Sequence, residues 1–182
     1  MNATRLAILA ILIPAVLGGA FMYYNIVYAG YAELTPEQVG EIQLVSVVSG
    51  EPEPIMLDNV MAIDTVEDGV RISGAISFRA CFDAPQSQAM LSETFEIMGD
   101  PVPLTAPSWF ECFNAQEIGK ALEDGEAIAF MSEENISFGV DRVVAIMPDG
   151  RGFVWHQLNA CGEAVFAGDN TPEDCPEPPE DF

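Results

Sequence analysis

An apolar stretch near the start of the chain places the strongest constraint on what this sequence can become. Residues Leu6 to Tyr31 contain no charged side chain. A helix needs about 20 apolar residues to cross a hydrocarbon core roughly 30 Å thick, and this stretch is long enough. Aromatic rings that favour the headgroup layer gather toward its far end, at Tyr23, Tyr24, Tyr28 and Tyr31. The sequence therefore predicts a transmembrane anchor over residues 1–32, with residues 6–31 in contact with the membrane.

The positions of the basic residues predict the orientation of this anchor. Arg5 precedes the apolar stretch, and the next basic residue is Arg71. Because cytoplasmic flanks carry the excess of Lys and Arg, we expect a single pass through a bacterial inner membrane, with a cytoplasmic N-terminus and a periplasmic domain. A cleaved signal peptide is the alternative, because residues 18–20 are small. Apolar sequence continues past Ala20, which favours a retained anchor.

The charge of the chain excludes some partners. About 150 residues follow the anchor, enough for one domain with a core. The chain has 29 acidic and 6 basic residues and a net charge of −23. Nucleic acid is excluded and an anionic lipid surface is disfavoured, because both need basic contacts. The acidity indicates either a solvated surface for solubility or salt adaptation, or a docking face for a basic periplasmic partner such as a cationic cytochrome or a loop of a membrane protein complex.

Four cysteines predict a disulfide framework rather than a metal site. They are Cys81, Cys112, Cys161 and Cys175, and none is spaced as C-x-x-C. An even, dispersed set in an exported domain is typical of disulfides. Of the three pairings that four cysteines allow, we favour Cys81–Cys112, which ties a strand to a Trp-Phe-rich loop, and Cys161–Cys175, which closes a short C-terminal loop. In a cytosolic domain they would instead be small buried apolar residues.

Turn residues and periodicity divide the rest of the chain into short elements. The expected helices are a short one after Thr35-Pro36, one over 88–95 and one over 115–124 capped by Asn114. The expected strands are 42–48, 70–82, 127–131 and a hairpin, 142–147 with 151–158, around Pro148-Asp149-Gly150. Residues 51–54 indicate a turn or spacer, residues 55–65 are ambiguous, and residues 99–107 are too proline-rich for a helix or a central strand.

These elements predict an α+β fold. We expect one N-terminal transmembrane helix followed by a small antiparallel sheet, covered on one side by one or two helices. The domains are then the anchor (1–32), a periplasmic α+β domain (33–168) and an acidic, proline-rich C-terminal tail (169–182). Beyond Cys175 the composition predicts disorder.

The sequence holds no catalytic signature. The motifs G-x-S-x-G, G-x-x-x-x-G-K-[ST], G-x-G-x-x-G and the EF-hand loop are absent, and a single histidine, His156, cannot build a His-rich metal site. We therefore predict no catalytic residue, no metal and no cofactor. The candidate binding residues are Arg79, Trp109, Arg142, Trp155, His156 and Asn159. Trp109, with Phe110 and Phe113, is either core or an exposed anchor for a partner.

Several segments together resemble a known family. They are 78–82 (FRACF), 103–113 (PLTAPSWFECF), 141–145 (DRVVA), 148–151 (PDGR) and 155–159 (WHQLN). They are similar to uncharacterised alphaproteobacterial proteins, mostly of the Rhodobacter–Roseobacter group, with an N-terminal membrane segment and one domain. The resemblance implies no function. Some members carry a histidine kinase label, which this chain contradicts because it has no nucleotide-binding motif. Residues 160–182 look like an extension beyond the usual end of the family.

Three functional hypotheses follow. The first is a membrane-anchored, non-catalytic periplasmic protein, an accessory or assembly subunit or a binding module of a membrane complex. The second is a small-ligand-binding or hydrolytic domain with a pocket near His156, Arg79 and Arg142, which requires these side chains to converge. The third is thiol redox chemistry, which requires an exposed thiol of low pKa.

Overall fold

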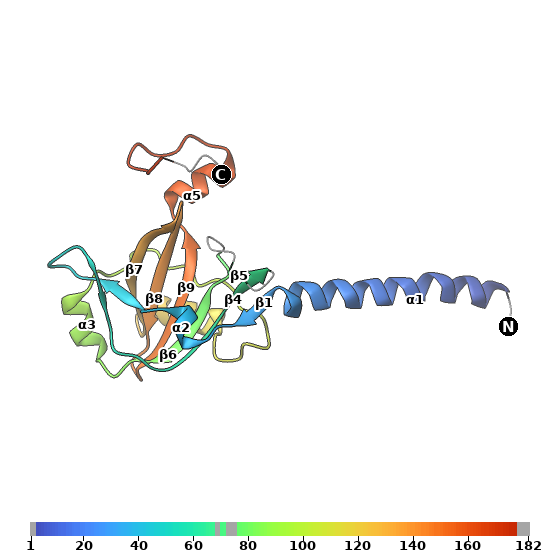
Figure 1. Ribbon diagram of the computed structural model, residues 1–182, viewed down its shortest axis with the longest axis horizontal. Coiled ribbons are helices and arrows are strands. Elements are labelled where there is room, and N and C mark those ends of the chain that lie inside the picture. Colours follow the sequence, from blue (N-terminus) through green and yellow to red (C-terminus); the bar gives the residue numbers. More distant parts are fainter. Residues whose placement is uncertain (1–2, 68–69, 72–75, 178–182) are drawn as a thin grey trace.

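An antiparallel sheet forms the centre of the domain (Figure 1). The structure, a computed structural model, describes residues 3–67, 70–71 and 76–177. The sheet strands are β1 (Tyr31–Glu33), β4 (Asp58–Glu67), β5 (Val70–Arg71), β6 (Arg79–Asp83), β7 (Ile128–Ser137), β8 (Val140–Ile146) and β9 (Arg151–Leu158). Their order is β1-β4-β6-β9-β8-β7, with β5 paired to β4. A separate two-stranded sheet joins β2 (Gln43–Val45) and β3 (Pro52–Pro54).

Both faces of the central sheet are buried. Successive residues of a strand point to opposite faces, so neighbours in sequence belong to different halves of the core. On β8, Val144 packs in one apolar cluster and Val143 in the other, and all seven residues of this strand are buried. Leu44 of β2 and Leu91 of α3 (Gln88–Thr94) cover one face, which we call the β2/β3 face.

The opposite face, called here the α4 face, is covered by α4 (Ala115–Glu123) and by the loop before it. Ile118 of α4 and the loop residues Phe110 and Phe113 are buried there. The fold class is therefore the expected α+β. Helices lie on both faces rather than on one, because the central strands are apolar in both directions and leave neither face for solvent.

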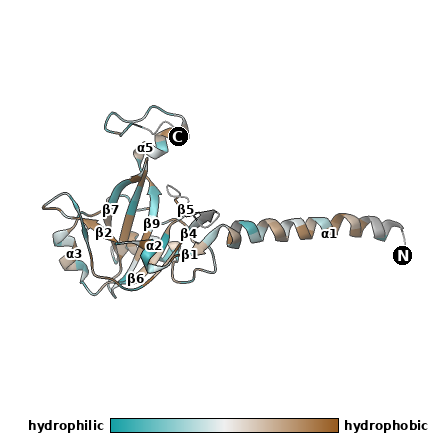
Figure 2. Cartoon of the chain, in the orientation of Figure 1, coloured by the Kyte–Doolittle hydropathy of each residue, from teal (hydrophilic) through white to brown (hydrophobic). Residues whose placement is uncertain are grey.

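The N-terminal helix leads directly into the sheet. α1 (Ala3–Tyr24) continues as one π-helical turn, η1 (Asn25–Ala29), and only Gly30 separates this turn from β1. α1 extends away from the domain (Figure 1), and apolar residues recur along it (Figure 2). Residues Ile8–Ala29 are long and apolar enough to cross a membrane, and none of this segment's most apolar window is buried.

Several local predictions are confirmed. α2 (Pro36–Val39) follows Thr35, which forms a capping box with Gln38. Asn114 caps α4 because its Oδ1 accepts hydrogen bonds from the backbone amides of Gln116 and Glu117, and the hairpin is formed by β8 and β9. Both predicted disulfides are present, Cys81–Cys112 and Cys161–Cys175. Their loops of 31 and 14 residues are worth about 3–4 and about 3 kcal/mol by chain entropy.

Other elements differ from the predictions. The expected spacer 51–54 is an edge strand, β3, where proline is tolerated because no neighbour needs its missing amide hydrogen. The ambiguous segment 55–65 is largely β4, and the expected strand 70–82 is two strands, with residues 72–75 outside the described part. β7 is longer than expected. α5 (Ala160–Ala167), which Asn159 caps, was not among the predicted helices. The described tail ends at residue 177, so its expected disorder stays a prediction.

Two glycines fix the position of α5. Gly162 at its start packs directly against the backbone of Gly139, which has a φ of +70° in the β7–β8 turn. A Cβ atom on Gly162 would overlap the carbonyl oxygen of Gly139. Only a backbone shift can relieve this overlap, so α5 depends on the absence of a side chain.

We expect Gly162→Ala to destabilise the domain by about 1–3 kcal/mol, as overpacked sites do, and to release α5. Thermal unfolding and hydrogen exchange of the α5 amides measure the two effects. Gly119→Ala in α4 is the control, because its Cβ meets only Pro103 Cγ at 3.6 Å, an ordinary contact. Unchanged protection of α5 in Gly162→Ala would contradict this account.

Candidate functional site

Arg142 and His156 lie together inside the β2/β3 face. Arg142 Nε donates a hydrogen bond of 3.1 Å to His156 Nε2, so this nitrogen carries no proton. The His156 ring stacks on Phe78 with 4.9 Å between centroids, and the Arg142 guanidinium lies 5.0 Å from the same ring. All three side chains are buried. This arrangement is typical of a satisfied polar group within a core.

Arg79 lies on the α4 face, on the other side of the sheet. Its guanidinium lies 5.8 Å from the centre of the Phe113 ring and donates to the carbonyl oxygens of Leu104 (2.9 Å) and Ile76 (2.7 Å). Burial lowers the pKa of Arg79 to about 10, partly offset by Tyr31 and Asp64. The side chain is therefore cationic at neutral pH and ties the proline-rich loop to the sheet.

The predicted pocket of Arg79, Arg142 and His156 does not form. Arg79 pairs with Trp155 and Arg142 with His156, and Trp155 and His156 are neighbours on β9. Neighbours on a strand point to opposite faces, so the two arginines are separated by the sheet. The sequence could not predict this, because it requires the register of three strands.

Two further candidates have structural partners. Trp155 is fully buried, and its Nε1 donates to Gln157 Oε1 at 3.1 Å. Asn159 caps α5 and donates from Nδ2 to Asp141 Oδ1 at 2.8 Å. Trp155 is closed off from solvent, whereas Asn159 is half-buried and its amide serves the cap of α5.

Trp109 occupies a different position, at the junction with the N-terminal helix. Its Nε1 donates a 2.8 Å hydrogen bond to the carbonyl oxygen of Val27 in η1, and its ring is half-buried. Phe110 and Phe113, which follow it, are core residues. Trp109 is the least buried of this aromatic group, and it borders open space.

That open space is a groove along the Cys81–Cys112 disulfide, which we call the disulfide groove. It comprises two cavities of about 500 and about 360 Å³ that share Met61, Glu111 and Cys112. Its lining consists of Glu33, Leu34, Asn59–Ala62, Cys81–Asp83, Trp109–Cys112, Asn114, Glu117 and Arg151–Phe153. The larger cavity adjoins Trp109 and therefore opens beside the end of the N-terminal helix.

A cross-strand row forms the floor of the groove. Met61 on β4 pairs with Cys81 on β6, which pairs with Phe153 on β9. The disulfide fastens the 109–112 wall over this row. Met61 remains 53% exposed. A flexible, exposed methionine beside a half-buried tryptophan is the kind of apolar surface that adapts to partners.

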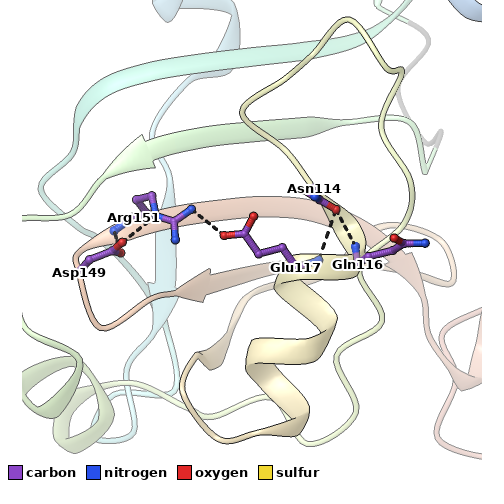
Figure 3. Close-up of polar contacts among 5 residues, drawn as sticks. All are labelled: Asn114, Gln116, Glu117, Asp149 and Arg151. Carbon is purple, nitrogen blue, oxygen red and sulfur yellow. Dashed lines mark hydrogen bonds and ion pairs between the residues drawn. The ribbon is translucent and has the colours of Figure 1, made fainter.

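The rim of the groove is acidic. Glu33 and Glu111 border the larger cavity, and Asp83, Glu111 and Glu117 border the smaller one. Arg151 is the one basic residue among the described lining residues. It is already paired: its Nη1 lies 3.0 Å from Glu117 Oε1 and its Nε lies 2.8 Å from Asp149 Oδ2, beside the Asn114 cap (Figure 3). The rim therefore carries a net negative charge.

The groove offers apolar side chains and carboxylates on its surface. Its described lining contains no serine, threonine, histidine or free thiol, so the usual activated hydroxyl or thiol is not available. Within the part of the chain that the structure describes, no cluster of three metal-ligating side chains occurs and no buried side-chain polar atom lacks a hydrogen-bond partner. All four cysteines are in disulfides, which leaves no thiol for the redox hypothesis.

Comparison with known proteins places the domain in a family. Residues 42–176 match the model of a family of unknown function, DUF6446. The chain belongs to this family. The match includes α5 and the Cys161–Cys175 disulfide, so the prediction that residues 160–182 extend beyond the family is wrong for most of that segment. No curated protein and no solved structure matches the chain.

Sequence reasoning found one wall of the groove and missed the other. Trp109, Cys81 and Cys112 were candidates because of their residue types and pairing. Met61 and Glu33 were not candidates, because they lie in segments with weak periodicity. They come close to the 109–112 loop only through the register of the strands. The sole sequence signal was the predicted disulfide, which brings residues 81 and 112 together.

The ion pair between Arg151 and Asp149 should contribute to stability in a pH-dependent way. Hydrogen bonds from Arg151 lower the pKa of Asp149 below its ordinary value, so the ionised carboxylate stabilises the fold above that value and the contribution is lost as pH falls through the lowered pKa. We expect Arg151→Gln to raise the pKa of Asp149 toward that of a free aspartate, as measured by carboxyl-carbon NMR titration. Lys120→Gln is the control, because Lys120 pairs with Asp124 instead. An unshifted titration in Arg151→Gln would show that the pair is not formed in solution.

Proposed function

We propose that this DUF6446 protein is a membrane-anchored, non-catalytic binding module. It passes once through a bacterial inner membrane, presents its domain in the periplasm and acts as an accessory or assembly subunit of a membrane protein complex. The disulfide groove is its binding site.

The observation that carries the proposal is the junction between helix and groove. Gly30 alone connects η1 to β1, and the Trp109–Val27 hydrogen bond adds a second attachment from the groove wall. A hydrogen bond of this kind contributes about 1 kcal/mol, and its larger effect here is to orient the wall relative to the helix. The groove is thus held beside the point where the proposed anchor leaves the membrane.

Two further features support this reading. Disulfides are typical of domains in oxidising compartments such as the periplasm, and the helix Ile8–Ala29 has the length and composition of a membrane span. The candidate groups for catalysis, Arg142 and His156, are buried and bonded to each other. Binding is what the exposed chemistry of the groove supports.

The location can be tested by thiol labelling of membranes from the native host, with intact mass as the readout. We expect four labelled thiols only after reduction, on a chain that retains residues 1–31. Labelling without reduction would place the domain in a reducing compartment, and a chain that begins after residue 20 would identify a cleaved signal peptide. Either result would overturn the proposed topology.

The binding site can be tested by photocrosslinking in the same host. We expect benzoylphenylalanine at position 61 to give one discrete crosslinked membrane protein, because Met61 lies on the groove floor. Met90 on α3 is the matched control, the same residue type with 50% exposure against 53%, on the other side of the sheet. Equal crosslinking from positions 61 and 90, or none from position 61, would contradict the groove as the site.

A further inference from the structure

We propose that the disulfide groove binds a cationic polypeptide segment of a partner protein, in which Lys or Arg side chains flank an apolar side chain. This inference rests on the proposed function and specifies the partner's chemistry. The volume of the groove does not identify the class of ligand, since cavities of about 300–1,000 Å³ take many ligands. The arrangement of charge around an apolar floor identifies it.

The larger cavity separates an apolar centre from an acidic rim. Met61 and the Trp109 ring supply the centre, and the exposed Glu33 and Glu111 border it from two different segments, the end of β1 and the 109–112 loop. A partner that fits must carry an apolar group between positive charges. A polypeptide segment with an apolar residue between basic residues can present this pattern, because the long Lys and Arg side chains bend sideways to the rim when the apolar side chain enters the groove.

The smaller cavity continues the same charge. Asp83 and Glu117 lie on its border, and the single cation there, Arg151, already has two carboxylate partners. Asn59 Nδ2 donates to Asp83 Oδ2 at 2.8 Å, which holds that carboxylate at the rim. A cationic segment entering from the Trp109 side therefore meets further carboxylates along its path.

Two other occupants fit less well. An anionic lipid headgroup would face a rim of carboxylates. A second copy of this chain brings few cations: of the five basic residues that follow Arg5, Arg79 and Arg142 are buried, and Lys120 and Arg151 are exposed but paired. With a net charge of −23, two copies also repel each other. The charge complementarity is to a basic protein.

The test uses the full chain in detergent micelles and a fluorescein-labelled peptide, Gly-Ser-Lys-Leu-Lys-Leu-Lys-Ser-Gly, with fluorescence anisotropy as the readout. We expect saturable binding that Glu33→Lys/Glu111→Lys weakens about tenfold or more, equivalent to about 1.4 kcal/mol. The matched control is Glu53→Lys/Glu93→Lys, two exposed carboxylates away from the groove. Each double variant changes the net charge from −23 to −19, since every Glu→Lys adds two charges. The control variant should change the affinity for the peptide less than about twofold, well below the tenfold effect expected of the groove variant.

Further arms separate the apolar contact from bulk charge. Replacing both leucines of the peptide with serine should weaken binding about tenfold, and raising the salt from about 50 to about 500 mM should weaken it as well, because the rim is solvent-exposed. Three outcomes would each overturn the proposal. They are an equal loss of peptide affinity in the two double variants, peptide binding that does not depend on the leucines, and stronger binding of the protein to vesicles of anionic lipid than to the peptide.

These outcomes are distinct from failure of the proposed function. If position 61 crosslinks a membrane protein in the host while the cationic peptide does not bind, the module and its groove stand and the inferred chemistry of the partner is wrong. If position 61 gives no crosslink and the peptide does not bind, both the proposed binding function of the groove and the inferred chemistry of the partner are wrong.

Discussion

The alternation of side chains across a sheet that is buried on both faces decides where the polar groups of this domain lie. β8 is buried throughout, and the residues that flank it on β9 divide between two apolar clusters. A polar residue in these strands has no solvent to face, so it must find a partner within its own half of the core. Arg142 donates a hydrogen bond to His156 on one side of the sheet, and Arg79 donates to backbone carbonyls on the other. A pocket that combined the two would have to pass through the sheet.

The disulfide groove opens at the margin of the sheet, where the covering layers end. On the α4 face the cover narrows to the 109–112 loop, which is fastened at one point by the Cys81–Cys112 disulfide and at another by Trp109. The disulfide groove lies between this loop and the strands below it. Its chemistry follows from its place, since its floor is an apolar cross-strand row and its rim is part of a strongly acidic surface.

The sequence was sufficient where the determinants were local or chemically specific. Asn114 and Gly125 bounded α4, Pro-Asp-Gly located the β8–β9 hairpin, and the spacing of the cysteines favoured the observed pairing. It was insufficient where the structure depends on long-range pairing. β3 is a strand only because β2 lies beside it, and α5 packs through the close approach of Gly162 to Gly139, which no periodic pattern records. The groove needs the register that brings Met61 beside Cys81, so its floor could not be predicted.

The single residue between helix and sheet limits how far the domain can travel. One extended residue spans roughly 3.5 Å, whereas a flexible linker of many residues would let the domain search a large volume. In the proposed topology, a domain so connected stays at the membrane surface and meets other molecules chiefly by lateral diffusion in that plane. A partner embedded in the same membrane then encounters the groove in a fixed orientation and at a high effective concentration. A partner free in solution has to descend to the membrane before it can bind.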